Sequence, residues 1–133
     1  MYFFDTGLVS HLLGISTPEQ LDTHHYFGNI VENYLIAELY KKRTNAGKKP
    51  VFWFWQDKKG NEVDLIIEED GLIKAIEIKA SQTYNTRLMS GLTYWQNFEV
   101  TEPRAQYLVY GGQQKMDLDA GKLMPWQTAL EEL

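Results

Sequence analysis

Two acidic residues and one lysine stand in a part of the sequence that is typical of paired β-strands. Asp64 lies within residues 62–68, and Glu77 and Lys79 lie within residues 72–79. Carboxylate oxygens are ligands that Mg²⁺ prefers, together with water and phosphate oxygens. A lysine beside them can orient or deprotonate a water, or offset the charge that develops on a phosphate. These residue types point to metal-assisted chemistry on a phosphate ester.

The turn between the two expected strands determines which residues face one another. Asp70-Gly71 favours a two-residue type I′ hairpin turn, and in that register Asp64 lies opposite Glu77. Opposed side chains lie roughly 4.5–5.5 Å apart at Cβ. Glu77 and Lys79 share a face because side chains alternate along a strand. A three-residue turn would shift the register by one position and place Asp64 and Glu77 on a diagonal.

Folding alone gives no reason for two acids to face each other, because opposed like charges destabilise a hairpin. A divalent cation would relieve the repulsion. Each feature taken alone has an ordinary interpretation, since Glu-X-Lys on a strand is usually a solvated face and a single Asp is often an edge or bulge residue. Their combination predicts that Asp64 and Glu77 bind Mg²⁺ or Mn²⁺ and that Lys79 assists.

The elements that must position these residues follow from the spacing of apolar residues. Residues 26–43 repeat apolar residues at steps of three and four, which predicts a long helix. Two short helices are expected before it, one over residues 5–13 and one that begins at Thr17. Strands are expected at residues 51–56, 62–68, 72–79 and 105–110, and helices at residues 86–98 and 128–133. Within the second strand the alternation places Val63, Leu65 and Ile67 on one face.

The expected fold class is α/β, a mixed β-sheet flanked by helices with a helical N-terminal segment. The hairpin face that carries the acids also carries Ile66 and Ala75, so a helix must cover it. The helix at residues 26–43 is the expected cover. It contains Glu32 among apolar residues, and this glutamate would supply a third carboxylate. Taken alone, Glu32 is more often a surface residue of a helix.

Composition limits the function classes. The chain has 133 residues of which 44% are hydrophobic, which predicts one compact domain with a real core. It has no cysteine, which excludes disulfides, thiolate metal sites and cysteine nucleophiles and agrees with a cytoplasmic location. No apolar run approaches the ~20 residues that span a membrane. The net charge of −5 argues against strong autonomous binding to nucleic acid.

At Glu32, Asp64 and Glu77-Ile78-Lys79 the sequence resembles the PD-(D/E)XK nuclease superfamily, whose pattern is a helical acid, an Asp, and Glu-X-Lys on adjoining strands. More closely, the chain resembles domain of unknown function 4143, the C-terminal domain of prokaryotic AAA-type ATPases. The stretches that carry this second resemblance are "YFFDTGLVSHLLGI", "GNIVENYLIAEL", "WFWQDKKGNEVDLII" and "AIEIKAS", within about the first 85 residues.

The resemblance implies a restriction-endonuclease-like core over residues 1–133 as a single domain, with a P-loop ATPase domain as its partner in the full-length protein. This chain has no GxxxxGK[ST] run. In the superfamily the residues that match Asp64 and Glu77 hold Mg²⁺, the match to Lys79 assists the water, and the match to Glu32 completes the site. The implied function is metal-dependent hydrolysis of DNA phosphodiesters. The alternative is a non-catalytic docking, regulatory or DNA-binding module of the ATPase.

A few further residues are candidates for contact with DNA. Lys58 and Lys59 lie in a turn near the expected sheet and could touch phosphate, although a solvated turn is the default. The superfamily often has another Gln or Tyr after Glu-X-Lys, and Gln82, Tyr94 and Gln96 are the candidates. Spacing does not choose among these three.

Overall fold

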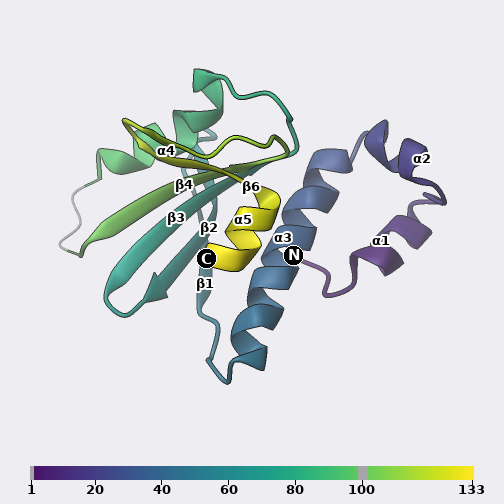
Figure 1. Cartoon of the computed structure of the whole chain (residues 1–133), viewed down its shortest axis with the longest axis horizontal. Helices are drawn as coiled ribbons and strands as arrows, with labels where there is room; N and C mark the ends of the chain where they lie inside the picture. Colours follow the sequence, from purple (N-terminus) through teal and green to yellow (C-terminus); the bar gives the residue numbers. More distant parts are fainter. Residues whose placement is uncertain (1, 99–101) are drawn as a thin grey trace. The chain divides into compact units, whose positions relative to one another are not determined.

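In the computed structural model, residues 2–98 and 102–133 are described (Figure 1). The chain divides into two compact units, Met1–Pro50 and Val51–Leu133. The N-terminal unit is helical, and the C-terminal unit contains a six-stranded β-sheet with helices. No helix among the described residues is both long enough and apolar enough to cross a membrane.

The helices of the N-terminal unit begin where the sequence predicts. The Asp5 side chain accepts a hydrogen bond from the Leu8 amide at 3.0 Å and caps the first helix. Thr17 and Gln20 form a capping box at the start of the second helix. The third helix is the long one and extends two residues past the predicted end. The three helices of the N-terminal unit are α1 (Thr6–Leu12), α2 (Pro18–Asp22) and α3 (Phe27–Asn45).

The sheet of the C-terminal unit is mixed, as predicted, and its strand order is β1-β2-β3-β4-β6-β5. β1, β2 and β3 are antiparallel neighbours, β4 is parallel to both β3 and β6, and β5 is antiparallel to β6. The strands are β1 (Phe52–Gln56), β2 (Glu62–Glu69), β3 (Leu72–Lys79), β4 (Arg104–Tyr110), β5 (Met116–Leu118) and β6 (Gly121–Pro125). The helical segments are η1 (Thr86–Met89), α4 (Ser90–Gln96) and α5 (Trp126–Glu132).

The turn between β2 and β3 confirms the predicted type. Asp70 and Gly71 have φ angles of 53° and 76°, which is the left-handed pair that a type I′ turn requires. Glu69 pairs with Leu72, as that register demands. The turn therefore sets the register that brings the acidic residues near one another.

A β-bulge corrects one expectation about β2. The register between β1 and β2 shifts between Trp53 and Trp55, so β2 has one extra residue at this point. Val63 consequently packs in the same buried cluster as Ile66, and not on one face with Leu65 and Ile67 as strict alternation predicted. The bulge lies at Asp64 and Leu65, because these two residues of β2 stand between the displaced pairs.

One face of the sheet is covered by η1 and α4. A continuous buried cluster joins these helical segments to β2, β3, β4 and β6. The two helical segments together occupy the region where the sequence predicted one helix at residues 86–98. α5 packs against β4 and β6. The members of the buried cluster are Val63, Ile66, Ala75, Met89, Leu92, Leu108, Tyr110 and Leu123.

Candidate functional site

The structure brings Asp64, Glu77 and Lys79 together at the open end of the β2–β3 hairpin. The Lys79 ammonium lies 2.5 Å from Glu77 Oε1 and 3.9 Å from Asp64 Oδ2. Only 5% of the Glu77 side chain and 8% of the Asp64 side chain are exposed, against 30% of Lys79. The site is thus two buried acids that share one partly exposed lysine.

Asp64 is held by the backbone of the neighbouring strand. The paired residues of β2 and β3 run from the turn to Leu65 and Ile76. Beyond that pair, Asp64 Oδ2 accepts a hydrogen bond from the Ile78 amide at 2.7 Å. The carboxylate therefore takes an amide that a regular ladder would bond to backbone. The β2–β3 pairs follow the predicted register as far as Leu65 and Ile76, and the direct opposition of Asp64 and Glu77 stays a prediction.

Glu77 is covered by α4 at Gly91. A Cβ atom added at Gly91 would lie 3.1 Å from Glu77 Oε2 and 2.3 Å from the Glu62 carbonyl oxygen. A glycine therefore lets the helix approach β2 and the acid closely. Glu77 Oε2 is buried and has no hydrogen-bond partner among the described residues. Gly91 was not predicted as a site residue, although a glycine inside a region that otherwise favours helix is a signal of close packing.

The charges of the site act on one another. Burial, and then the charge of Asp64, raise the pKa of Glu77 from 4.5 to about 7, although Lys79 opposes them. Burial acts to lower the pKa of Lys79, but the charges of Asp64 and Glu77 outweigh it and leave that pKa raised. Lys79 is therefore an ammonium at neutral pH. Glu62, which is exposed and was not predicted as a site residue, also raises the pKa of Glu77.

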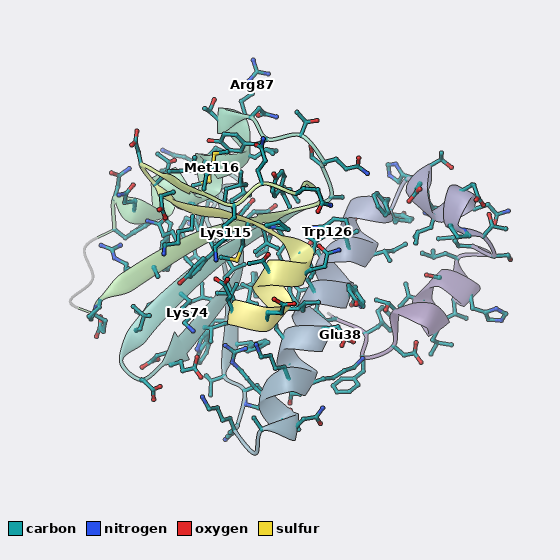
Figure 2. The ribbon with its side chains drawn as sticks, in the orientation of Figure 1. Glu38, Lys74, Arg87, Lys115, Met116 and Trp126 are labelled. Carbon is teal, nitrogen blue, oxygen red and sulfur yellow. The ribbon has the colours of Figure 1, made fainter. Side chains whose placement is uncertain are left out.

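The backbone at Lys79 is fixed by α5 and by the end of β4. The indole nitrogen of Trp126 donates a hydrogen bond to the Lys79 carbonyl at 3.2 Å. Figure 2 shows Trp126 at the start of α5. Nearby, the Gly111 amide donates to the Ser81 carbonyl at 2.9 Å. The backbone of Lys79 is thus held by contacts with α5, while its side chain is partly exposed.

The other predicted residues lie outside this cluster. Lys58, Lys59 and Gln82 are exposed. They are therefore accessible to a phosphate group, but they do not belong to the cluster of Asp64, Glu77 and Lys79. Glu32 lies on α3 in the N-terminal unit, and its Oε1 accepts a hydrogen bond from the Tyr2 hydroxyl at 2.7 Å. Its membership of the site stays a prediction, as does the expectation that α3 covers the acids.

The two remaining candidates lie on α4. Tyr94 stacks on Trp55 with ring centroids 5.9 Å apart, and Gln96 is exposed near the end of the helix. These observations do not single out Tyr94, Gln96 or Gln82 as the further polar residue that the resemblance implies.

Carboxylate oxygens are the right kind of ligand for a hard divalent cation, but the site offers only two carboxylates, Asp64 and Glu77, among the described residues. Asp64 and Glu77 offer carboxylate oxygens, and Mg²⁺ is commonly held by one or two carboxylates with water and phosphate oxygens completing its shell. Among residues 2–98 and 102–133, no group of three His, Cys, Asp or Glu residues lies close enough to hold a metal. A cation here would have to share the two acids with the Lys79 ammonium.

Comparison with known proteins gives a family but no activity. Residues 27–129 match the model of the family described as "Domain of unknown function (DUF4143)". The matched region begins at α3, includes the whole sheet and reaches into α5, so it contains Asp64, Glu77 and Lys79. No curated protein matches the chain. Because the family model covers well over half of its residues, the chain belongs to the DUF4143 family.

Proposed function

We propose that this domain hydrolyses DNA phosphodiesters at Asp64, Glu77 and Lys79, with Mg²⁺ or Mn²⁺ as its cofactor. One observation carries the proposal: two neighbouring buried acids share the Lys79 ammonium as a counter-charge. A buried excess of negative charge costs stability unless a cation compensates it. The orphaned Glu77 Oε2 supports this view, because a buried carboxylate normally has a partner for each oxygen.

Each residue has a distinct role in the proposed reaction. Asp64 and Glu77 would hold the cation, and the hydrogen bond from the Ile78 amide keeps the Asp64 carboxylate in place. A bound divalent cation supplies Lewis-acid activation of water and phosphate. Lys79, freed from Glu77 by the cation, would offset charge on the phosphate and orient the attacking water. Its partial exposure leaves the ammonium accessible to a substrate.

The restriction-endonuclease-like core and the ATPase partner belong to the same proposal. Support comes from the order of elements, in which the β2–β3 hairpin carries the acids and a helix then leads to the parallel strand β4. The PD-(D/E)XK resemblance at Asp64 and Glu77-Ile78-Lys79 matches that order. Under this proposal the domain works in the cytoplasm beside a P-loop ATPase domain of the same protein.

Cleavage of supercoiled plasmid in Mg²⁺ or Mn²⁺ tests the proposal. The informative variant is Asp64→Asn, because its side-chain oxygen still accepts from the Ile78 amide while the charge is lost. We expect its cleavage rate to fall at least about 100-fold, the scale of losing a group that stabilises the transition state. Glu69→Gln, at the other end of the same hairpin, is the matched control and should cleave like the parent. Equal rates for Asp64→Asn and the parent, or no cleavage by the parent, would remove the enzymatic assignment.

A non-catalytic docking, regulatory or DNA-binding module is the second candidate. The net charge of −5 favours it, since a domain that acts on DNA alone is usually basic. Mn²⁺ titration followed by electron paramagnetic resonance separates the two. The proposed function requires Mn²⁺ binding that Asp64→Asn weakens and Glu69→Gln does not. Salt-dependent DNA binding without Mn²⁺ binding would favour the second candidate.

A further inference from the structure

A hollow lies wholly within the N-terminal unit and takes no part in the proposed reaction. Its volume is about 330 Å³, which is at the small end of ligand-binding pockets. It is formed by the N-terminal segment, α1 and the first turns of α3. The residues that line it are Tyr2, Phe3, Val9, Leu13, Tyr26, Asn29, Ile30, Glu32 and Asn33.

The wall formed by Tyr2 and Phe3 is fixed in place by α3. The buried side chain of Asn33 accepts a hydrogen bond from the Phe3 amide at 2.6 Å and donates one to the Phe3 carbonyl at 2.9 Å. The Tyr2 hydroxyl donates to Glu32 at 2.7 Å. These three bonds hold an otherwise extended segment against the helix, so the pocket is preorganised and little ordering is required on binding.

The pocket combines an apolar floor with exposed aromatic rings. Tyr2, Phe3 and Tyr26 are 45%, 46% and 49% exposed although rings of this size normally bury most of their surface. Phe4 and Leu12, which neighbour lining residues in the sequence, are 60% and 70% exposed. Aromatic rings left exposed at a pocket are a feature of sites where a protein partner docks.

The charge of the pocket selects the kind of partner. Glu32 is the single acidic residue of the lining, and the lining contains no Lys, Arg or His. Within the described part of the chain, Glu32 accepts a hydrogen bond from the neutral Tyr2 hydroxyl and forms no ion pair. Its negative charge is thus left uncompensated at the edge of an aromatic pocket.

We propose that this pocket binds a lysine or arginine side chain presented by a protein partner. The aliphatic stem would pack on Val9, Leu13 and Ile30, as such stems do on apolar surfaces. The cation would meet the aromatic rings, an attraction that strengthens when the site is desolvated, and the Glu32 carboxylate. The proposal gives Glu32 a role different from the supporting role implied by the nuclease resemblance, and it does not depend on Asp64 or Glu77.

Nuclear magnetic resonance titration of the ¹⁵N-labelled whole chain at low salt tests the proposal. The probes are Nα-acetyl-lysine amide and Nα-acetyl-arginine amide, and the uncharged match is Nα-acetyl-norleucine amide. We expect the side-chain amide signals of Asn29 and Asn33 to shift with the cationic probes at millimolar concentration, and not with norleucine. The relative affinity of the two cationic probes identifies which side chain is preferred.

Substitutions localise the effect. Glu32→Gln keeps an acceptor for Tyr2 and removes the charge, so we expect the dissociation constant to rise about tenfold. Glu38→Gln is the matched control on the same helix, where Glu38 pairs with Lys41 at 2.8 Å outside the pocket and is labelled in Figure 2. Equal shifts with lysine and norleucine probes, or unchanged affinity in Glu32→Gln, would overturn the proposal. If putrescine, a free diamine, bound more tightly than a lysine-centred peptide, the proposal that the occupant is a protein side chain would be overturned.

Discussion

The β2–β3 hairpin carries a charged cluster at each end, and the two clusters differ in the number of acidic residues that lie beside one lysine. Near the turn, Lys74 pairs with Glu69 at 3.0 Å, one cation with one anion (Lys74 is labelled in Figure 2). At the open end, Lys79 is shared by Asp64 and Glu77, and these two acids are more deeply buried than Glu69. Near the turn one acid lies beside one lysine, whereas at the open end two buried acids lie beside one lysine. The open end therefore concentrates more acidic groups around its lysine than the turn does.

The largest expected difference between the two ends is in pH dependence. The folded-state pKa of Glu77, about 7, lies above its ordinary value of 4.5, so the folded chain holds that proton more tightly. The free energy of unfolding should therefore fall as pH rises from about 4.5 to 7, by on the order of 3 kcal/mol. Urea unfolding at pH 5 and pH 8 with a chelator measures this fall. Glu77→Gln should lose it and Glu69→Gln should keep it; the same fall in both variants would contradict the comparison.

Close packing of α4 is the next difference. A methyl group at Gly91 meets the Glu62 carbonyl at 2.3 Å, so Gly91→Ala must displace the helix from the acids. We expect a loss of about 2 kcal/mol in stability, a usual cost of overpacking. Gly28→Ala on α3 is the matched helical control, because a Cβ there meets no atom within 4 Å. Thermal unfolding of the two variants should move in opposite directions, since alanine favours helix. A stabilised Gly91→Ala would show that α4 does not press on the site.

Removal of each lysine should change stability by different, smaller amounts at the two ends of the hairpin. Lys79→Met leaves two neighbouring acids without their cation, and we expect a loss of about 1 to 2 kcal/mol at pH 8. Protonation of Glu77 should reduce that loss at pH 5. Lys74→Met removes a simple pair and should cost no more than about 1 kcal/mol. Denaturant titration of both variants at both pH values checks this, and an equal, pH-independent cost would erase the distinction.

The smallest expected effect concerns the turn itself. Gly71 has a φ of 76°, so Gly71→Ala forces a side chain into the left-handed region and should cost about 1 kcal/mol. That cost is conformational, and the fall in stability with pH should be unchanged. Urea unfolding across the same pH range provides the test. A changed pH dependence would mean that the turn and the acids are coupled through the register.

Local signals in the sequence were sufficient for much of the fold. Asp70-Gly71 predicted the turn type and hence the pairing of Glu69 with Leu72. Thr17-Pro18 predicted the start of α2, and β3 begins and ends where its alternation does. All of these depend on residues that are neighbours in the chain, and so short-range propensity decides them.

Features that depend on distant contacts were missed. The bulge in β2 depends on its pairing with β1, and the hydrogen bond from the Ile78 amide to Asp64 depends on β3, so no period-two pattern displays either of them. β5 has three residues, and β6 pairs in parallel with the distant β4, so neither gave a strand signal. Sequence reasoning found the three residues of the candidate site, but it did not find Gly91, whose importance arises from what α4 approaches.

The hydrogen bond from the Ile78 amide to Asp64 links the electrostatics of the acids to the integrity of the sheet. Protonation of this carboxylate would weaken its bond to the strand amide, because a charged acceptor forms the stronger hydrogen bond. Solvent exchange at that single amide thus records the state of the carboxylate. The exchange rate of one backbone amide of β3 therefore reports the protonation state of the neighbouring acid.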